Sequence, residues 1–278
     1  MTLQQANPAE EIRRAHRAAL TAVQRAVTRN CGLWRSIGDP DARVPGLAWT
    51  AGETAAHVVG DLRENTEALS GRAPHVNTAS ASPSRISAAV NAQQLTEVRE
   101  RDMGRLADLL DDAATRYLSV ATAIAEDSVV TIPNGLVTTA PTMTSLLLGE
   151  QLIHGLDIAR AARRPWSISR DEALLVIPGV LSLAPHYVHP ARSAGVHVSF
   201  ELRMRGGGRY RFAVHDGAAH IGAAGEKADC VISADPAAFL LLGYGRIPPW
   251  APVIRGKLLA SGRKPWLAPK FATLLTRP

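Results

Sequence analysis

Two histidines and a glutamate are the residues of this chain whose types and spacing indicate chemistry. Glu150 and His154 lie four residues apart in an apolar segment that has the pattern of one helix. Residues i and i+4 share a helix face, so these two side chains can converge on one point. His57 lies far upstream, in a second segment with a helical pattern. If the two helices face each other, the three side chains form a His2Glu set, which binds a divalent ion and leaves one coordination position open.

Each part of this set also has an ordinary interpretation. A histidine in an apolar helix is commonly a core residue, and a Glu–His pair at this spacing is frequent on helix surfaces. The surroundings favour the metal, because residues 146–149 and 152–153 are apolar or glycine. A buried carboxylate needs a positive partner to offset its lost hydration, and a divalent ion supplies one.

Two aspartates stand where they could hold the histidines. Asp157 follows His154 by three residues, and Asp61 follows His57 by four. A metal-bound histidine normally donates its second N–H to an outer oxygen, which fixes its tautomer. The alternative for Asp157 is an ion pair with an arginine further along the same helix.

Length and composition describe a globular chain with room for two cores. The chain has 278 residues, of which 46% are apolar and 20% charged. It contains no secretory signal and no apolar run long enough to span a membrane, so no membrane partner is expected. Cys31 and Cys230 lie in different halves and do not suggest a disulfide framework. We therefore expect a cytoplasmic protein, as a monomer or homodimer.

The net charge of +6 comes largely from dispersed arginines. No basic run is interleaved with aromatic residues, so nucleic acid is not expected as a partner. Scattered arginines can instead steer anionic small molecules toward a site.

The N-terminal part has the pattern of a four-helix bundle with one long crossover, a frame that can hold a metal between facing helices. Asn7 and Pro8 are typical of a helix start, and Thr50 with Glu53 predicts a capping box at the second helix. The expected helices cover residues 8–31, 50–70, 84–126 and 142–163. Gly104 can kink or divide the third, and residues 72–83 and 127–141 are expected as connections.

The pattern changes after Pro165, so the expected domains are residues 1–165 and 166–278. Ser169 opens a helix, after which residues 196–204 and 210–214 alternate in the manner of strands. Asp216-Gly217 is a hairpin signal. A further strand over 228–233 and helices over 236–243 and 264–276 complete a small domain. The fold class expected is therefore a two-domain α+β chain.

These motifs resemble those of the mycothiol-dependent maleylpyruvate isomerase family, part of the DinB-like metal-binding superfamily. The resemblance is carried by Trp49-Thr-x-x-Glu-x-x-x-His57, by Glu150-x-x-x-His154-x-x-Asp157, and by residues 228–243 with the later Ala260-Ser-Gly. It covers the whole chain and implies a DinB-like four-helix bundle joined to a smaller sterol-carrier-like α+β domain. It also implies that His57, Glu150 and His154 are the three metal ligands.

The resemblance further implies two cofactors: a divalent ion, usually zinc, and mycothiol, the low-molecular-weight thiol of actinobacteria. A thiol bound to the ion loses its proton and becomes a nucleophile. In this family it acts on a small electrophile, by cis–trans isomerisation of maleylpyruvate or by S-transfer and thiol exchange in relatives. Asp157 is then a catalytic candidate. Arg246, in a loop between glycines and prolines, is the candidate for an arginine placed over the metal by the second domain.

The chain departs from the isomerases at two places. Family members carry a Tyr/Ser/Arg segment at the start of the third helix, where this chain has Ser82-Pro-Ser-Arg85. They also carry an arginine just before the metal-binding glutamate, where this chain has Leu146-Leu-Leu-Gly149. An anionic diacid would need basic partners near the metal, so the family predicts fold and metal better than substrate.

Two non-enzymatic hypotheses remain beside the thiol-dependent enzyme. One is a metal-binding regulatory protein without turnover. The other is a metal-independent carrier of a hydrophobic ligand, with a cavity in the second domain lined by residues 239–242, Trp250 and Trp266. The ordinary interpretation of these apolar residues is the core of a small domain.

Overall fold

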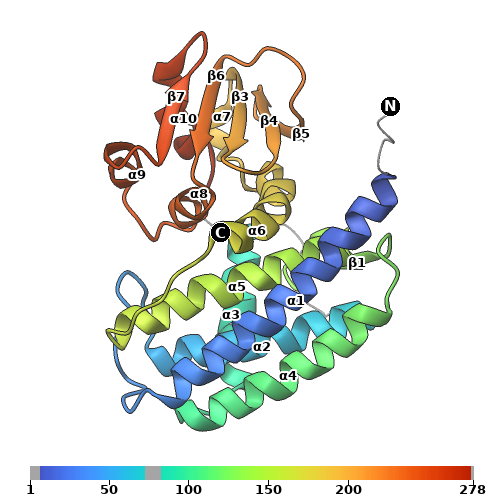
Figure 1. Cartoon of the computed structure of the whole chain (residues 1–278), viewed down its shortest axis with the longest axis vertical. Coiled ribbons are helices and arrows are strands. Elements are labelled where there is room, and N and C mark those ends of the chain that lie inside the picture. The colour runs from blue at the N-terminus through green and yellow to red at the C-terminus, as the bar shows by residue number, and fades with distance from the viewer. Residues whose placement is uncertain (1–6, 73–82, 277–278) are drawn as a thin grey trace. The chain divides into compact units, whose positions relative to one another are not determined.

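The computed structural model describes residues 7–72 and 83–276, and the expected connection at 72–83 lies almost wholly outside them. The chain divides into two compact units, Met1–Ser167 and Ile168–Pro278. The first unit is helical and the second contains a five-stranded sheet, so the expected α+β class is confirmed (Figure 1). No helix among the described residues is long and apolar enough to cross a membrane.

Four helices of the first unit form a bundle, in which α1 and α2 each pack against both α4 and α5 (Figure 1). The bundle helices are α1 (Pro8–Arg35), α2 (Ala51–Leu69), α4 (Met103–Ala123) and α5 (Ala140–Ala161). A further helix, α3 (Pro83–Glu97), packs against α2. The single region expected over 84–126 is therefore two helices. The break falls at residues 98–102, ahead of Gly104, because the Asp102 side chain caps α4.

The expected helix starts are present at α1 and α2. The Asn7 side chain accepts from the Ala9 N–H, and Thr50 and Glu53 make both bonds of a capping box. The end of α1 lies at Arg35, beyond the expected stop at residue 31. Trp34 in this last turn is fully buried, and its packing offsets the low helix propensity of the preceding glycine.

The connection between α4 and α5 contains a short hairpin that the sequence pattern did not predict. Strand β1 (Val129–Thr131) pairs antiparallel with β2 (Val137–Thr139), and Gly135 has a φ of 84° in the turn between them. Strands of three residues are too short to show an alternating pattern.

A buried hydrogen-bond network ties three bundle helices together. The Thr144 hydroxyl donates to the Ala140 carbonyl, so it can accept from the Tyr117 hydroxyl at 2.8 Å and from His16 Nε2 at 3.1 Å. Burial lowers the pKa of His16 and raises that of Tyr117, so both are neutral near pH 7. The network thus satisfies polar groups within an apolar core at no cost in buried charge.

The second unit is a mixed sheet with strand order β5-β4-β3-β6-β7. Strand β3 runs parallel to β6, and the other neighbours are antiparallel. The strands are β3 (His197–Met204), β4 (Arg209–His215), β5 (Ala218–Ala223), β6 (Cys230–Ala234) and β7 (Leu258–Ser261). The remaining elements are α6 (Arg170–Leu183), η1 (Ala184–Tyr187), α7 (Pro190–Ser193), α8 (Pro236–Gly243), α9 (Trp250–Ile254), η2 (Pro265–Leu267) and α10 (Ala268–Leu274).

The hairpin turn that the sequence predicts is present in this sheet. The two edge strands, β5 and β7, were not predicted. Asp216 and Gly217 have φ values of 48° and 86°, as a tight hairpin requires, and they join β4 to β5. Strand β5 is rich in alanine and glycine, and β7 is four residues long, so neither has a strand-like pattern.

The core of the second unit lies between the sheet and its helices. Phe271 of α10 packs edge-on against Phe200 and Phe212 of neighbouring strands, with ring centroids 5.3 and 5.4 Å apart. The prediction that Trp250 and Trp266 line an apolar cavity is wrong. Trp250 and Trp266 are 64% and 70% exposed, so they do not enclose an apolar space.

Candidate metal centre

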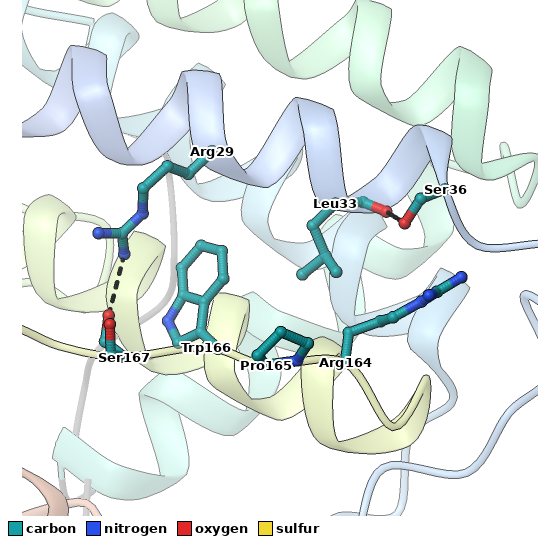
Figure 2. Close-up of a pocket in the computed structure, with 7 residues that line it drawn as sticks. All are labelled: Arg29, Leu33, Ser36, Arg164, Pro165, Trp166 and Ser167. Atoms are coloured by element: carbon teal, nitrogen blue, oxygen red, sulfur yellow. Dashed lines mark hydrogen bonds between the residues drawn. The ribbon is translucent and has the colours of Figure 1, made fainter.

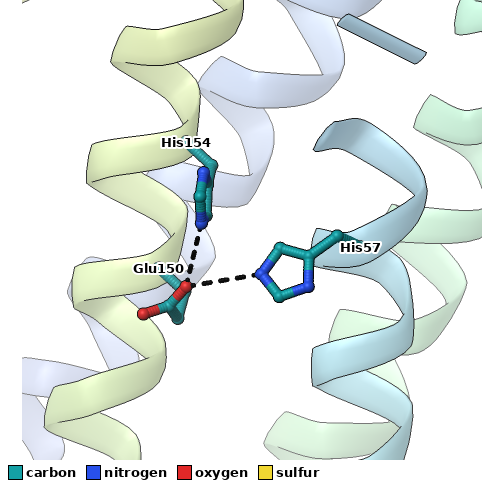
Figure 3. A group of neighbouring side chains, drawn as sticks. All are labelled: His57, Glu150 and His154. Atoms are coloured by element: carbon teal, nitrogen blue, oxygen red, sulfur yellow. Dashed lines mark ion pairs between the residues drawn. The ribbon is translucent and has the colours of Figure 1, made fainter. Parts of the chain in front are cut away.

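The fold of the first unit brings His57, Glu150 and His154 together between α2 and α5 (Figure 3). One possible ligand atom from each residue lies within 4.8 Å of the other two. Glu150 Oε2 is 3.6 Å from His57 Nε2 and 3.1 Å from His154 Nε2. The i, i+4 spacing on α5 and the packing of α2 against α5 produce this convergence.

The cluster is buried on its histidine side and open at its carboxylate. The side chains of His57 and His154 are 6% and 10% exposed, whereas that of Glu150 is 27% exposed. Glu150 is therefore the member of the cluster that is most exposed to solvent.

Both imidazoles have their second nitrogen occupied by an outer oxygen. His57 Nδ1 lies 2.6 Å from Gln94 Oε1, and His154 Nδ1 lies 3.0 Å from Asp157 Oδ2. These oxygens are acceptors, so each Nδ1 carries the proton and donates. Each Nε2 is then turned toward the common space beside Glu150, where it can offer a lone pair to an ion once it carries no proton. Metal-binding histidines have this arrangement, and two imidazoles with a carboxylate suit zinc.

The outer partner of His57 differs from the expected one. Asp61 accepts from the Asn65 side chain at 2.9 Å, and Gln94 of α3 occupies His57 Nδ1 instead. Burial, followed by the charges of Glu150 and Glu64, raises the pKa of Asp61 well above its ordinary value. Asp61 therefore lies within electrostatic reach of the cluster but does not orient the imidazole.

Without an ion, hydrogen bonds and opposite charges between His154 and the two carboxylates beside it hold the cluster together. Burial alone would lower the pKa of His154, but its hydrogen bonds to Asp157 and Glu150 outweigh burial and raise the pKa to about 9. Burial alone would raise the pKa of Glu150, but hydrogen bonds from His154 and His57 outweigh it and lower the pKa. An ion that binds to Nε2 of His154 must therefore displace a proton.

Trp49 and Gln94 are the two neighbours of the cluster to which sequence reasoning gave no role. The Trp49 ring lies 5.0 Å from that of His57 and 6.4 Å from that of His154, so it forms an aromatic wall beside both. Trp49 belongs to the motif that carries the family resemblance, but the motif gave it no contact with the histidines. A signal for Gln94 was present in the sequence. It is the polar residue in a series with a spacing of four whose other members, Ile86, Val90 and Val98, are apolar.

The two catalytic candidates have different surroundings. Asp157 is 1% exposed and accepts from His154, so it acts through that ring. Arg246 lies between α8 and α9 of the second unit, where its Nη1 donates to the Tyr244 carbonyl at 2.7 Å. Its role over the metal stays a prediction.

A groove of about 580 Å³ lies elsewhere on the first unit, between α1 and the segment after α5 (Figure 2). Its walls are Arg29, Leu33, Ser36, Arg164, Pro165, Trp166 and Ser167. The Trp166 indole donates to the Leu152 carbonyl and lies against Gly155, where an added Cβ would be 2.3 Å from the ring. The groove shares no residue with the cluster, but its tryptophan fixes the helix that carries Glu150 and His154.

Comparison with known proteins agrees with this geometry. Residues 33–159 match the family described as "Mycothiol maleylpyruvate isomerase N-terminal domain". The matched segment contains α2, α3, α4 and most of α5, so this part of the bundle has the sequence pattern of that family. This match confirms the resemblance seen in the sequence and includes all three residues of the cluster. No curated protein matches the chain.

Two solved structures resemble the chain over almost its whole length. They are a mycothiol-dependent maleylpyruvate isomerase, 15% identical, and a histidine-to-alanine mutant of such an isomerase, 14% identical. Each has a TM-score of 0.54, with 94% of this chain and 96% of the other covered. At this identity the likeness establishes the fold, which extends to the C-terminal unit.

Proposed function

We propose that this protein is a thiol-dependent metalloenzyme whose divalent ion, zinc, is held by His57, Glu150 and His154. The observation that carries the proposal is the shared orientation of the two imidazoles. Both donate from Nδ1 to an outer oxygen, and both direct Nε2 toward Glu150 Oε2. Two histidines and one carboxylate leave a coordination position for an exogenous ligand.

We propose mycothiol as that ligand, because residues 33–159 match a family named for this thiol and the similar solved structures carry the same name. When bound, the divalent ion would supply a Lewis acid that keeps a thiol in its nucleophilic thiolate form at neutral pH. The chain's own residues orient the donors, exclude water and leave one side open at Glu150.

The proposed reaction is addition of the thiolate sulfur to a small electrophile, in cis–trans isomerisation or in S-transfer. Isomerisation is supported by the names of the family and of the similar structures. S-transfer stays within the proposal because Leu146-Leu-Leu-Gly149 precedes Glu150, at the place where the resemblance to the isomerases implies an arginine suited to a diacid. Asp157 is proposed as a positioning residue for His154, and Trp49 as an apolar wall for the electrophile or the thiol.

Cobalt substitution tests this proposal directly. A thiolate ligand adds an intense sulfur-to-metal charge-transfer band in the near ultraviolet, so mycothiol should produce that band and its oxygen analogue should not. Binding should release about one proton per thiol at neutral pH. A panel of electrophiles then distinguishes isomerisation, which regenerates the thiol, from S-transfer, which consumes it. A cobalt spectrum that no low-molecular-weight thiol changes would contradict the proposal.

A further inference from the structure

One face of α3 has a polar residue at the position where packing alone calls for an apolar one. The buried side chains on this face recur every four residues, at Ile86, Val90, Gln94 and Val98, the last just past the helix end. Gln94 is only 1% exposed, the least of the four. A buried amide is costly unless its hydrogen bonds are made, whereas leucine or methionine at this position would pack with no such cost.

Both side-chain hydrogen bonds of Gln94 go to α2, and one of them connects it to the metal cluster. Its Oε1 accepts from His57 Nδ1 at 2.6 Å, and its Nε2 donates to Glu64 Oε2. His57 and Glu64 lie seven residues apart on α2, so they share a face of that helix. When ionised, the Glu64 carboxylate fixes which end of the amide faces His57, because only the NH2 group can donate to it.

A glycine on α2 allows this close approach. Gly60 lies between His57 and Glu64, and a Cβ at its position would lie 2.8 Å from Gln94 Cβ and 2.9 Å from Gln94 Cγ. Any larger residue at position 60 would push Gln94 away from both of its partners. Gly60 of α2 therefore makes room for Gln94 of α3. His57 and Glu64 of α2 bind the two ends of its amide, which gives one hydrogen-bond chain, Glu64–Gln94–His57.

We propose that Gln94 is a positioning residue for the metal centre: it fixes the tautomer and ring orientation of His57, and it couples the docking of α3 to metal binding. This inference rests on the proposed metal centre. Gln94 holds the proton on Nδ1 and so keeps the Nε2 lone pair of His57 available to an ion. Binding of an ion at Nε2 makes Nδ1–H a stronger donor, so the same bond holds α3 more firmly. By thermodynamic reciprocity, α3 docked through Gln94 must raise metal affinity.

The test compares zinc affinities of variants, measured by competition with a chromophoric chelator. Gln94→Leu keeps the volume and apolar packing but removes the acceptor, and we expect its zinc affinity to fall about 10- to 100-fold. Val90→Ala, one turn earlier on the same buried face, is the matched control. It should lower the melting temperature and leave zinc affinity unchanged within about twofold, because it makes no bond to His57.

An exchange variant separates positioning from packing and covers the case in which Gln94→Leu fails to fold. In the double variant Gln94→Glu and Glu64→Gln, the side chain at position 94 still accepts a hydrogen bond from His57. The side chain at position 64 now donates a hydrogen bond to the side chain at position 94. We expect this double variant to bind zinc at least as tightly as the wild type. Gln94→Glu alone places two carboxylates side by side and should not be equivalent.

Hydrogen exchange gives a second measurement that does not use activity. Zinc should slow amide exchange in α3 in the wild type and in Val90→Ala, but not in Gln94→Leu. If the wild type binds zinc and Gln94→Leu binds it equally well, or if zinc protects α3 equally in both, the positioning role is wrong while the metal centre stands. If the wild type binds no divalent ion at all, the metal centre and this inference fall together.

Discussion

His154 Nδ1 donates to Asp157 Oδ2 at 3.0 Å, one turn further along α5, and this bond turns Nε2 of the same ring toward Glu150. A single helix thus supplies two proposed ligands and the group that orients one of them. The third ligand comes from α2, so an ion at this site would connect two helices of the bundle.

Replacement of His57 or His154 by alanine should remove the bound ion. The affected protein should contain less than a tenth of the wild-type metal and melt at a lower temperature, because a ligand of the folded state stabilises it. Metal analysis of protein purified without added ions checks this. His16→Ala is the control: it removes another buried histidine of the bundle, lowers stability, and should leave metal content unchanged. Stoichiometric metal in both ligand variants would disprove the assignment.

Metal affinity should rise with pH up to about pH 9. The pKa of His154 without metal is raised to about 9, so a proton occupies the ring over the neutral range and competes with the ion. The stability of the metal-free protein should change with pH in the opposite direction. Protonated His154 stabilises that form fully below pH 6.5, and this contribution is lost as the pH rises through 9. Zinc competition and melting curves between pH 6 and 10, recorded on the same samples, measure both trends. A pH-independent affinity would contradict this picture.

Asp157→Asn should weaken metal binding about 10- to 100-fold, as loss of an outer carboxylate does at other histidine sites. Asparagine keeps the size and an acceptor oxygen but loses the charge that helps to raise the pKa of His154. The pH at which zinc and protons compete equally should therefore move downward. Isothermal titration at two pH values checks both effects. Asp157→Asn with unchanged affinity and pH profile would leave Asp157 without the proposed role.

Neither cysteine should be required for turnover. Burial, with a smaller effect from Asp111, raises the pKa of Cys31 to about 11, and burial also raises that of Cys230. Both thiols are therefore protonated and poorly nucleophilic near pH 7. The double variant Cys31→Ala and Cys230→Ala should keep thiol-dependent activity within about threefold of the wild type. Loss of activity in a folded double variant would indicate that the nucleophile is a cysteine of the protein and not the exogenous thiol.

Gly155→Ala should destabilise the bundle by about 1–3 kcal/mol, because the added methyl overlaps the Trp166 ring and the Asn30 side chain. Gly32→Ala in α1 is the matched control, since nothing lies within 4 Å of its added Cβ. It should be neutral or stabilising. Urea denaturation of both variants gives the comparison. Equal stabilities would show that Trp166 does not hold α5 in the way described.

Local sequence signals predicted much of the fold and the composition of the cluster. The caps at Asn7 and Thr50 depend on neighbouring residues alone, and so does the i, i+4 relation of Glu150 and His154. These features need no knowledge of the tertiary structure. The convergence of His57 on the same point required only that α2 and α5 be neighbours in a four-helix bundle.

The features that escaped prediction depend on contacts between distant segments. Gln94 reaches His57 only because α3 packs on α2 over Gly60, and no local pattern reveals that approach. Gly104 was expected to kink or divide a single helical region over 84–126, but the break lies ahead of it, where the Asp102 side chain caps α4. The strands β5 and β7 form because a neighbouring strand offers them hydrogen bonds, not because their own residues favour the extended state.

The order of the bundle helices has a consequence for synthesis on the ribosome. Helix α1 is the first to emerge, yet its apolar face is covered by α4 and α5, which emerge much later. Until α5 leaves the exit tunnel, the side of α1 that packs against α5 stays uncovered, and His57 cannot meet Glu150 and His154. The nascent chain therefore presents unsatisfied apolar helices for most of its translation, the state that chaperones bind. An ion held by the three proposed ligands could enter only after α5 has packed against α2, as the last step in assembly of the bundle.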